Sequence, residues 1–405
     1  MKMNEKQQLA IESNEQSVFL LSGAGTGKTS VITSKVNWIL TKISSNSKIL
    51  ILSFTKRSVF DLKKRFSKTN DNLFITTFHG LCYHMISADF DIHLFDAKFR
   101  GSLELSDAEL LQISASKRLL DFRRTITKPF YEYSLFLTKN QLIDYTDLEI
   151  LTLEKLKKSG QKLPEDATFD YIFIDEFQDT SMVQFELLKM LCQPKTKIFA
   201  VGDPDQSIYS FRGTGLNIID AYIKTFHANV LNLDQNYRCS VMILYHANLL
   251  IKHNRSKLRT TLKGIKKNEG IVQCHLIRKV EEEVSLVILN IRSLLNSGFQ
   301  QKEIAIIFRN HKDVVRLRYA LTDHYMTDIH LLSMHQSKGL EFKVVLIIGV
   351  KPVVYENKST LYEERRLFFV SMTRAMDHLY VYGYLNNKGM SRFLKECKFK
   401  YETHD

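Results

Sequence analysis

The stretch Val18-Phe19-Leu20-Leu21-Ser22-Gly23-Ala24-Gly25-Thr26-Gly27-Lys28-Thr29 joins an apolar run to a glycine-rich turn, and residues 30–43 follow with helical periodicity. Strand, glycine loop and helix in this order are typical of a phosphate-binding loop, where backbone N–H groups and a helix N-terminus face an anion. Lys28 is then expected to reach the β- and γ-phosphates, and Thr29 to ligate Mg²⁺. Ser22 replaces the usual first glycine of the pattern. A glycine turn without a ligand is the alternative.

A second strand ends in acidic residues. Residues 170–174 are mostly apolar and are followed by Asp175 and Glu176. An acid at the end of a strand near a phosphate loop holds Mg²⁺, and its neighbour can polarise the attacking water. We therefore expect Asp175 to bind metal and Glu176 to act as general base. Alone, such a pair is usually a solvated turn.

Apolar runs recur along the chain, and most are continuous rather than alternating, which is typical of parallel strands buried on both faces. Repeated strand and helix predict an α/β fold, and so many strands favour two sheets over one. The interval from about 84 to 166 has helical periodicity instead, which predicts a helical insertion. The runs are 18–21, 48–54, 74–78, 171–175, 197–201, 230–233, 271–277, 304–308, 329–334, 344–348 and 379–384.

Composition sets limits on the class of protein. The 405 residues carry 57 Lys+Arg against 44 Asp+Glu, a net charge of +13, which suggests a polyanionic partner or a basic, soluble surface. The hydrophobic share of 44% excludes global disorder. The most apolar stretch, residues 344–350, is far shorter than the ~20 residues of a membrane span. Residues 1–6 lack the apolar core of a secretory signal, and five scattered cysteines form no CxxC pair. We therefore expect a cytoplasmic protein without a membrane partner.

Several boxes in the sequence resemble, in the same order, those of superfamily 1A DNA helicases of the UvrD/Rep/PcrA type. They extend from about residue 4 to about residue 384, and seven or eight boxes in order make a chance resemblance negligible. The most specific are 175–180 (DEFQDT), 202–213 (GDPDQSIYSFRG), 235–238 (QNYR), 335–342 (HQSKGLEF) and 363–375 (EERRLFFVSMTRA).

This resemblance implies two RecA-like P-loop NTPase lobes with ATP between them. Residues 1–83 and 167–234 would form lobe 1 (1A), residues 84–166 a short helical 1B-like insertion, and residues 235–405 lobe 2 (2A). The family's 2B insertion would fall between Asn310 and His335, which only 24 residues separate. We therefore expect 2B to be absent.

The resemblance also assigns nucleotide contacts. Gln7 is implied to read adenine, Tyr237 to stack on it and Glu341 to lie near the ribose. Gln206 and Arg238 would contact the γ-phosphate, and Arg374 would be the arginine finger. The implied catalytic set is Lys28, Asp175, Glu176, Gln206, Arg238 and Arg374. The implied ATP-binding set is Gln7, Ser22, Gly23, Ala24, Gly25, Thr26, Gly27, Lys28, Thr29, Ser30, Tyr237, Arg238, Glu341 and Arg374, with Thr29 and Asp175 on Mg²⁺.

A second implied set follows single-stranded DNA. It combines aromatic residues that would stack on bases with polar and basic residues that would meet the backbone, and stacking of this kind tolerates any sequence. For any single aromatic residue, core packing is the alternative. The set is Phe54, Thr55, Thr77, His79, Tyr209, Phe211, Arg212 and His335.

The expected activity is a DNA-dependent ATPase that uses ATP and Mg²⁺ to move 3′ to 5′ on single-stranded DNA and to unwind tailed duplex. One alternative is the motor subunit of a nuclease, repair or anti-phage defence complex of the Gabija-like kind, with its nuclease on another chain. The other is a DNA-binding module switched by ATP without hydrolysis. The intact Lys28, Asp175, Glu176, Arg238 and Arg374 count against the latter. The sequence does not indicate a pathway.

Overall fold

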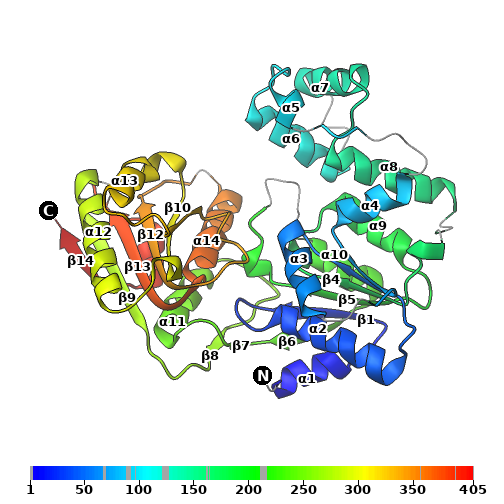
Figure 1. The fold of residues 1–405 in the computed structure, drawn as a ribbon, viewed down its shortest axis with the longest axis horizontal. Coiled ribbons are helices and arrows are strands. Elements are labelled where there is room, and N and C mark those ends of the chain that lie inside the picture. Colours follow the sequence, from blue (N-terminus) through cyan, green and yellow to red (C-terminus); the bar gives the residue numbers. More distant parts are fainter. Residues whose placement is uncertain are drawn as a thin grey trace. The chain divides into compact units, whose positions relative to one another are not determined.

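The computed structural model falls into two compact units (Figure 1). The first holds Met1–Ser22 and Lys28–Leu233, and the second holds Gly23–Gly27 and Asp234–Asp405. A short glycine loop is therefore grouped with the second unit, although the residues on either side of it belong to the first. The described residues are 3–66, 70–87, 93–95, 97–120, 127–160, 163, 165–209, 217–355, 357–387 and 389–404.

The first unit is built on a six-stranded sheet of order β3-β2-β4-β5-β1-β6, in which every neighbouring pair is parallel. Strands β4, β5 and β1 are neighbours, so the loops that follow them leave the same edge of the sheet. That edge is where ligands bind in open parallel sheets. The strands are β1 (Ser17–Ser22), β2 (Ile49–Leu52), β3 (Leu73–Thr76), β4 (Tyr171–Ile174), β5 (Lys197–Gly202) and β6 (Asn229–Leu233).

Helices cover both faces of this sheet, which explains why its strands are continuously apolar. One core cluster joins α1, α2 and α3 to the sheet through residues such as Ala10, Val31 and Leu62. On the other face, the ring of Tyr222 in α10 lies 6.0 Å from that of Phe19 in β1. The helices are α1 (Glu5–Glu12), α2 (Lys28–Trp38), α3 (Lys56–Arg65), α4 (Phe78–Ile86), α9 (Met182–Leu191) and α10 (Ile218–Phe226), and a π-helical turn (Ile39–Ile43) extends α2.

A group of helices with a core of its own lies between α4 and β4 in the chain. It comprises α5 (Ala97–Arg100), α6 (Asp107–Arg118), α7 (Lys128–Lys139) and α8 (Tyr145–Lys158). Lys117 of α6 pairs with Asp144 at 2.8 Å and with Asp147 at 2.6 Å, which ties α6 to the start of α8. Helix α8 packs on α4 and α9, so it attaches this group of helices to the part that bears the sheet.

The second unit repeats the plan with a sheet of order β11-β10-β12-β13-β9-β14, again parallel throughout. A small sheet of β7 (Gln235–Asn236) and β8 (Lys263–Gly264) precedes it. The main strands are β9 (Ile271–Ile277), β10 (Ile304–Phe308), β11 (His330–Ser333), β12 (Phe342–Val350), β13 (Ala375–Tyr384) and β14 (Tyr401–His404). The helices are α11 (Val241–Ile251), α12 (Val280–Asn296), α13 (His311–Asp323), α14 (Lys358–Met372) and α15 (Arg392–Cys397).

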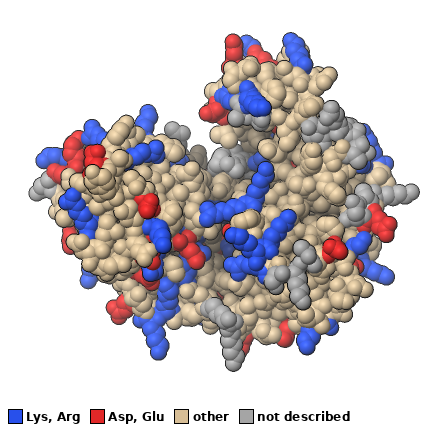
Figure 2. Space-filling model, in the orientation of Figure 1, with Lys and Arg blue, Asp and Glu red and all other residues tan. Residues whose placement is uncertain are grey.

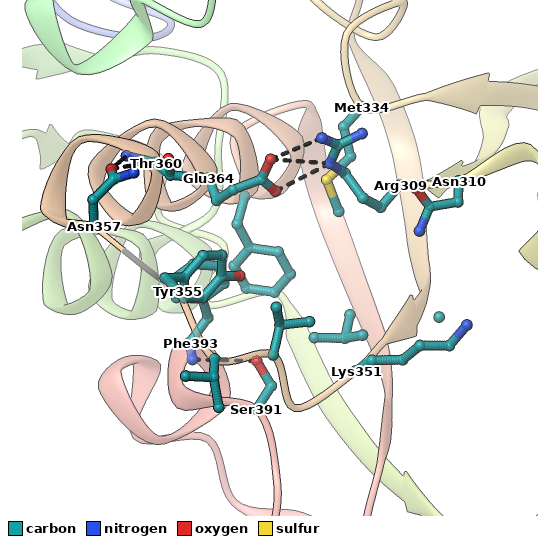
Figure 3. Close-up of a pocket in the computed structure, with 15 residues that line it drawn as sticks. Arg309, Asn310, Met334, Lys351, Tyr355, Asn357, Thr360, Glu364, Ser391 and Phe393 are labelled. Carbon is teal, nitrogen blue, oxygen red and sulfur yellow. Dashed lines mark hydrogen bonds and ion pairs between the residues drawn. The ribbon is translucent and has the colours of Figure 1, made fainter.

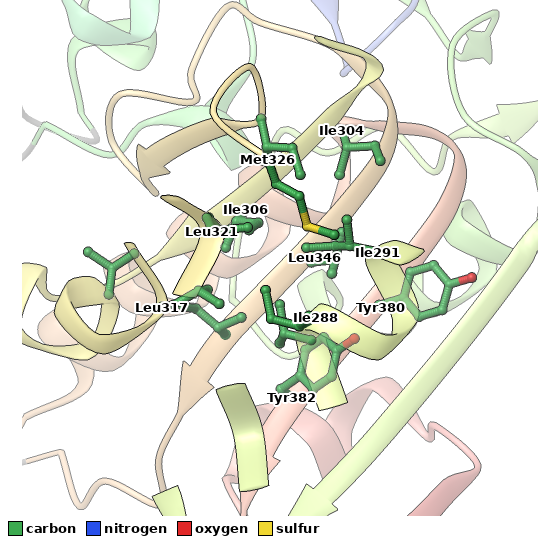
Figure 4. Packing of buried hydrophobic residues seen from close by; sticks show 14 of the residues in the cluster. Ile288, Ile291, Ile304, Ile306, Leu317, Leu321, Met326, Leu346, Tyr380 and Tyr382 are labelled. Atoms are coloured by element: carbon green, nitrogen blue, oxygen red, sulfur yellow. The ribbon is translucent and has the colours of Figure 1, made fainter. Parts of the chain in front are cut away.

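A core cluster of the second unit lies between this sheet and helices α12 and α13 (Figure 4). Ile288 and Ile291 of α12 and Leu317 of α13 pack there against Leu346 of β12 and Tyr382 of β13. Several of these side chains are fully buried, so removing one would cost the few kcal/mol typical of a large-to-small core substitution.

The predicted fold class, α/β with the strands divided between two parallel sheets, is confirmed. Each of the eleven apolar runs contains a strand. Strand β14 was not predicted because Tyr401–His404 is polar and mostly exposed, as an edge strand can be. Among the described residues, no helix is long and apolar enough to cross a bilayer.

Candidate functional site

Hydrogen bonds to its backbone carbonyl groups hold the glycine loop, residues 23–27, in place. The Asn236 side-chain amide donates to the Ala24 carbonyl at 2.7 Å, and the Tyr237 backbone N–H donates to that of Gly25 at 2.8 Å. Thr26 Oγ1 donates to the Gly23 carbonyl at 2.9 Å. These contacts use acceptors of the loop and none of its N–H donors, which are the groups that bind phosphate in such loops.

Glycine is required at position 25. Gly25 has φ of +64°, where residues with a side chain are strained. A Cβ there would lie 2.6 Å from Asn236 Nδ2 and 2.7 Å from Arg238 Cβ. The QNYR segment therefore shapes the loop as well as carrying predicted nucleotide contacts. Asn236 is a positioning residue to which the sequence alone assigned no role, although it stands in the QNYR box, because its partner lies 212 residues away.

Lys28, the first residue of α2, lies opposite the acidic end of β4. Its Nζ is 3.3 Å from Glu176 Oε1, and no described residue accepts a hydrogen bond from it. A mostly buried ammonium group that donates no hydrogen bond to a described residue is well suited to a phosphate. Thr29 and Ser30 continue α2, and Ser22 is the buried last residue of β1.

The two acidic residues at the end of β4 have different environments. Asp175 is 7% exposed, and its Oδ1 accepts a hydrogen bond from the Glu176 N–H at 3.0 Å. Glu176 has φ of +54°, a left-handed conformation that costs a non-glycine residue free energy and is found preferentially at functional sites. Hydroxyl and carboxylate oxygens are the ligands that Mg²⁺ prefers, so Thr29 and Asp175 fit the metal role predicted for them.

A chain of side-chain contacts leads away from Glu176 toward the loop after β5. Gln178 Nε2 donates to Glu176 Oε2, and Gln178 Oε1 accepts from the Asp203 N–H at 3.0 Å. Gln206 Nε2 then donates to Asp203 Oδ2 at 2.7 Å. Burial, with the nearby Asp205 carboxylate, raises the pKa of Asp203 to about 6. We call this chain of four residues, Glu176, Gln178, Asp203 and Gln206, the relay.

Tyr209, three residues after the end of the relay at Gln206, belongs to an aromatic pair. The rings of Tyr209 and Phe54 are stacked with centroids 5.3 Å apart and planes 25° from parallel. Both rings are half-buried, so the pair has a solvent-facing side. Phe211 and Arg212, the other predicted contacts of this box, lie outside the described residues.

Helix α3 begins next to Phe54 of this aromatic pair and carries a basic surface. Thr55, predicted to touch the strand, is its N-cap and accepts a hydrogen bond from the Ser58 N–H at 3.0 Å. The helix carries five exposed basic residues, and Figure 2 shows a group of Lys and Arg side chains over this part of the first unit. Such a surface attracts a phosphate backbone. The five are Lys56, Arg57, Lys63, Lys64 and Arg65.

His79 faces the helical group, although the resemblance placed it on the DNA backbone. Its Nε2 lies 3.1 Å from Oε1 of the fully buried Glu149 in α8, and its ring packs against Tyr145. Burial lowers the pKa of His79 to about 4 and raises that of Glu149 to about 7. The contact thus has the geometry of an ion pair, but both groups are neutral between these values. Thr77 caps α4 by accepting from the Gly80 N–H.

The predicted nucleotide contacts of the second unit have partners within it. Arg238 Nε is 2.7 Å from Glu341 Oε2, and its Nη1 donates to the Thr373 carbonyl. Arg374 is 2% exposed and donates to the backbone carbonyls of Val370 and Leu340. Its guanidinium is therefore held in a fixed orientation by the backbone.

The remaining predicted residues occupy turns and a helix start. Gln7 is 4% exposed, and its Oε1 accepts from the Asn4 N–H to close a capping box at α1. His335 lies in the turn after β11, where its carbonyl accepts from the Lys338 N–H. Tyr237 OH donates to Gln235 Oε1 at 3.2 Å.

The second unit also has a pocket of about 400 Å³ beside the carboxyl ends of β10 and β12 (Figure 3). An ion pair of 2.8 Å between Arg309 and Glu364 forms part of its wall. Tyr355 and Phe393 stack at 5.5 Å on the same wall. The lining includes none of the predicted site residues, so the pocket is separate from the predicted contacts.

Two parallel sheets, a glycine loop that leads into α2 and an acidic pair after β4 define a P-loop NTPase. Residues 3–119 and 102–227 match the family model of the UvrD/REP helicase N-terminal domain. Residues 231–327 and 319–386 match that of the UvrD-like helicase C-terminal domain. Together the matches cover most of the chain, which therefore belongs to the UvrD-like helicase family, as the boxes predicted.

Relatives with assigned names agree with this family. A probable DNA helicase II homolog of Mycoplasma capricolum is 30% identical over 351 residues, 76% of this chain and 49% of that protein. A probable DNA helicase of Mycoplasma pneumoniae is 27% identical over 94% of this chain and 83% of its own length. The ATP-dependent DNA helicase PcrA of Staphylococcus aureus is 27% identical over 76% of this chain. The chain spans about half the length of the first and third of these relatives.

Proposed function

We propose that this chain is an ATP-dependent motor that moves 3′ to 5′ along single-stranded DNA and displaces the complementary strand of a tailed duplex. The observation that carries the proposal is the relay within the first unit. It begins beside Lys28 at the phosphate site and ends three residues before Tyr209 in the aromatic pair. Side-chain contacts thus link the proposed nucleotide site to the loop after β5, and the main chain of that loop continues to the proposed base-stacking pair.

At the nucleotide end, Lys28 and the N–H groups of residues 23–27 would bind the phosphates of ATP. Thr29 and Asp175 would hold Mg²⁺, which neutralises charge on the transferring phosphoryl group. Glu176 would accept a proton from the attacking water. Arg238 and Arg374 would supply further positive charge, and Gln7, Tyr237 and Glu341 would hold the nucleoside.

Coupling would follow from competition for Lys28. A γ-phosphate attracts Lys28 and weakens its ion pair with Glu176. Glu176 is hydrogen-bonded to Gln178, and Gln178 holds the Asp203 N–H, so a shift of the carboxylate is passed to the loop that carries Tyr209. The grip on DNA would then change with each ATP.

We further propose that the motor is compact, with lobes at 1–83 plus 167–234 and at 235–405, a 1B-like insertion at 84–166 and no 2B domain. Residues 309–329, which connect β10 to β11, contain the single helix α13 and turns. Family members with 2B have a large insertion there. Duplex unwinding by this chain would then rest on the two lobes and the 84–166 insertion.

ATP hydrolysis with and without single-stranded DNA tests the proposal. Wild-type protein should be stimulated many-fold, whereas Lys28→Ala and Glu176→Gln should lose about 100-fold or more of the rate. Lys42→Ala and Glu12→Gln, at exposed positions, are the matched controls. Turnover that ignores DNA would refute the motor.

Strand displacement from duplexes with a 3′ tail, a 5′ tail or blunt ends tests the polarity. Only the 3′-tailed duplex should be opened at low protein concentration. Preference for the 5′ tail would refute the proposed direction while leaving the DNA-dependent ATPase intact.

A further inference from the structure

Two histidines and a glutamate meet at one edge of the second sheet, far in the sequence from every predicted site residue. His275 lies on β9, and Glu402 and His404 lie on the edge strand β14, which Figure 1 shows beside β9. His275 pairs directly with Glu402 in the register, and His404 follows two residues later. Because side chains alternate along a strand, all three project from the same face.

The three side chains approach one another closely through their ligating atoms. His275 Nδ1 lies 3.1 Å from His404 Nε2 and 3.8 Å from Glu402 Oε2, and the three atoms all lie within 4.8 Å of one another. Around tetrahedral Zn²⁺, ligand atoms at about 2.0–2.1 Å from the metal lie about 3.3 Å apart. The two measured distances lie on either side of that value, so small side-chain rotations would complete the geometry.

Neighbouring side chains hold the His275 ring in one orientation, as is usual for histidines that bind metal ions. His275 is 4% exposed, and its ring stacks on Tyr382 at 5.2 Å. The amide of Asn290 lies 3.4 Å from His275 Nε2 and 2.7 Å from the Tyr382 hydroxyl. The atom at these distances is Asn290 Nδ2, which donates to the Tyr382 hydroxyl. With the amide nitrogen and oxygen exchanged by a side-chain flip, Oδ1 would accept hydrogen bonds from both groups. His275 Nδ1 would then point its lone pair at His404 and Glu402, because a partner that accepts from the other ring nitrogen orients the imidazole of a metal-binding histidine.

We propose that His275, Glu402 and His404 bind a divalent transition metal ion such as Zn²⁺, which joins the edge strand β14 to β9. Two imidazoles and one carboxylate suit Zn²⁺, Co²⁺ or Ni²⁺ and not Mg²⁺ or Ca²⁺, which prefer oxygen ligands. Three protein ligands leave the fourth position to water. The exposed Glu402, at 75%, and the half-buried His404 give an ion access from solvent. The role is structural, because it attaches a four-residue edge strand whose side chains bury little apolar surface.

Cobalt binding tests the site directly. Protein treated with a chelator and then titrated with Co²⁺ should give the visible absorption of a four-coordinate ion at one equivalent, and Zn²⁺ should displace it. His404→Ala should abolish the absorption, and Glu402→Gln should weaken binding at least tenfold. His330→Ala is the matched control, because His330 is an exposed histidine on β11 at the opposite edge of the same sheet.

Thermal unfolding supplies the second measurement. Zn²⁺ should raise the Tm of the wild-type protein and of His330→Ala but not that of His404→Ala, since a ligand stabilises the state that binds it. Mg²⁺ at the same concentration should not reproduce the shift. If His404→Ala does not fold, the exposed Glu402→Gln decides the matter. Co²⁺ binding that is unchanged in both variants, or absent from the wild-type protein, would overturn the proposal.

Discussion

Gln178 bonds Glu176 with one end of its amide and the Asp203 backbone with the other, at 3.0 Å in the second case. A Cβ at position 202, just before Asp203, would lie 2.9 Å from Gln178 Oε1. Glycine at this position therefore leaves room for the Gln178 side-chain amide. Gln178 therefore connects the acidic end of β4 to the loop after β5.

We expect Gln178→Ala to separate hydrolysis from DNA stimulation. Lys28, Asp175 and Glu176 remain, so basal ATP hydrolysis should change by less than about tenfold. Stimulation by single-stranded DNA should largely disappear, because the Asp203 loop no longer follows Glu176. Steady-state ATPase rates across a DNA titration measure both quantities, with the exposed Gln273→Ala as control. Full stimulation in Gln178→Ala would contradict the role of the relay.

We expect the affinity for single-stranded DNA to depend on the aromatic ring of Tyr209 and not on its hydroxyl group. Base stacking is worth about 1–3 kcal/mol, so Tyr209→Ala should weaken binding of a labelled oligonucleotide roughly 5- to 150-fold. Tyr209→Phe should bind nearly as well as wild type. Fluorescence anisotropy at one salt concentration measures this, with Tyr319→Ala, 70% exposed on α13, as control. Equal affinities for the Ala and Phe variants would argue that the ring packs only against Phe54.

The buried Glu149 predicts a pH-dependent stability. Burial raises its pKa from 4.5 to about 7, so between these values the folded state binds more protons than the unfolded state, and stability falls as pH rises. Glu149→Gln keeps an acceptor for Gln184 and removes the charge. It should be more stable than wild type by roughly 1–3 kcal/mol at pH 8 and equal to it near pH 4.5.

Urea unfolding at a series of pH values measures this difference, and comparison at each pH cancels the contribution of other groups. Glu154→Gln, at an exposed position on the same helix, should show no such dependence. A Glu149→Gln variant that is less stable than wild type at pH 8 would mean that the ionised carboxylate is stabilised there by pairing with a protonated His79.

The second unit contains an ion pair whose loss should be costly. Arg365, 1% exposed, makes two hydrogen bonds of 2.7 and 2.8 Å to Glu396. Burial raises the pKa of Glu396, but hydrogen bonds from Arg365 and Arg392 outweigh it and leave the pKa below its ordinary value. The stabilisation should therefore be present above pH 4.5 and be lost as pH falls further.

Glu396→Gln should destabilise the protein by about 3–5 kcal/mol, because it leaves a buried guanidinium without its charged partner. Glu281→Ala is the matched control, since it removes the exposed pair with Arg316 and should hardly change the Tm. Thermal unfolding at pH 7 checks both variants. Equal changes of Tm in the two variants would mean that the existing hydrogen bond from Arg365 to Asn254 is enough to satisfy the guanidinium.

Much of the fold was predictable because parallel strands are buried on both faces and appear as continuous apolar runs. The positions of the glycine loop after β1 and of the acidic pair after β4 were predictable because both are local patterns in the sequence. Strand β14 was missed because an edge strand needs little apolar surface. The contact between His79 and Glu149 was missed because it joins residues 70 apart, and no local pattern records a partner in another helix.

The roles of Asn236 and Gln178 also could not be predicted from the sequence, because their partners are distant in the chain. Both stand inside boxes that were recognised, yet their roles depend on the Ala24 carbonyl and the Asp203 N–H, which only the folded chain brings near them. The sequence located the segments, whereas the hydrogen bonds between segments appear only in the folded chain.

The grouping of Gly23–Gly27 with the second unit has a practical consequence for anyone who divides this protein. A fragment that stops at Leu233 would keep Lys28, Asp175 and the whole of the first sheet, but it would lose the Asn236 amide and the Tyr237 N–H that grip the loop. A fragment cut after Leu233 would thus leave the carbonyl groups of Ala24 and Gly25 without these two donors. A fragment that runs on through β8, at Gly264, retains both donors and the strand that pairs with them.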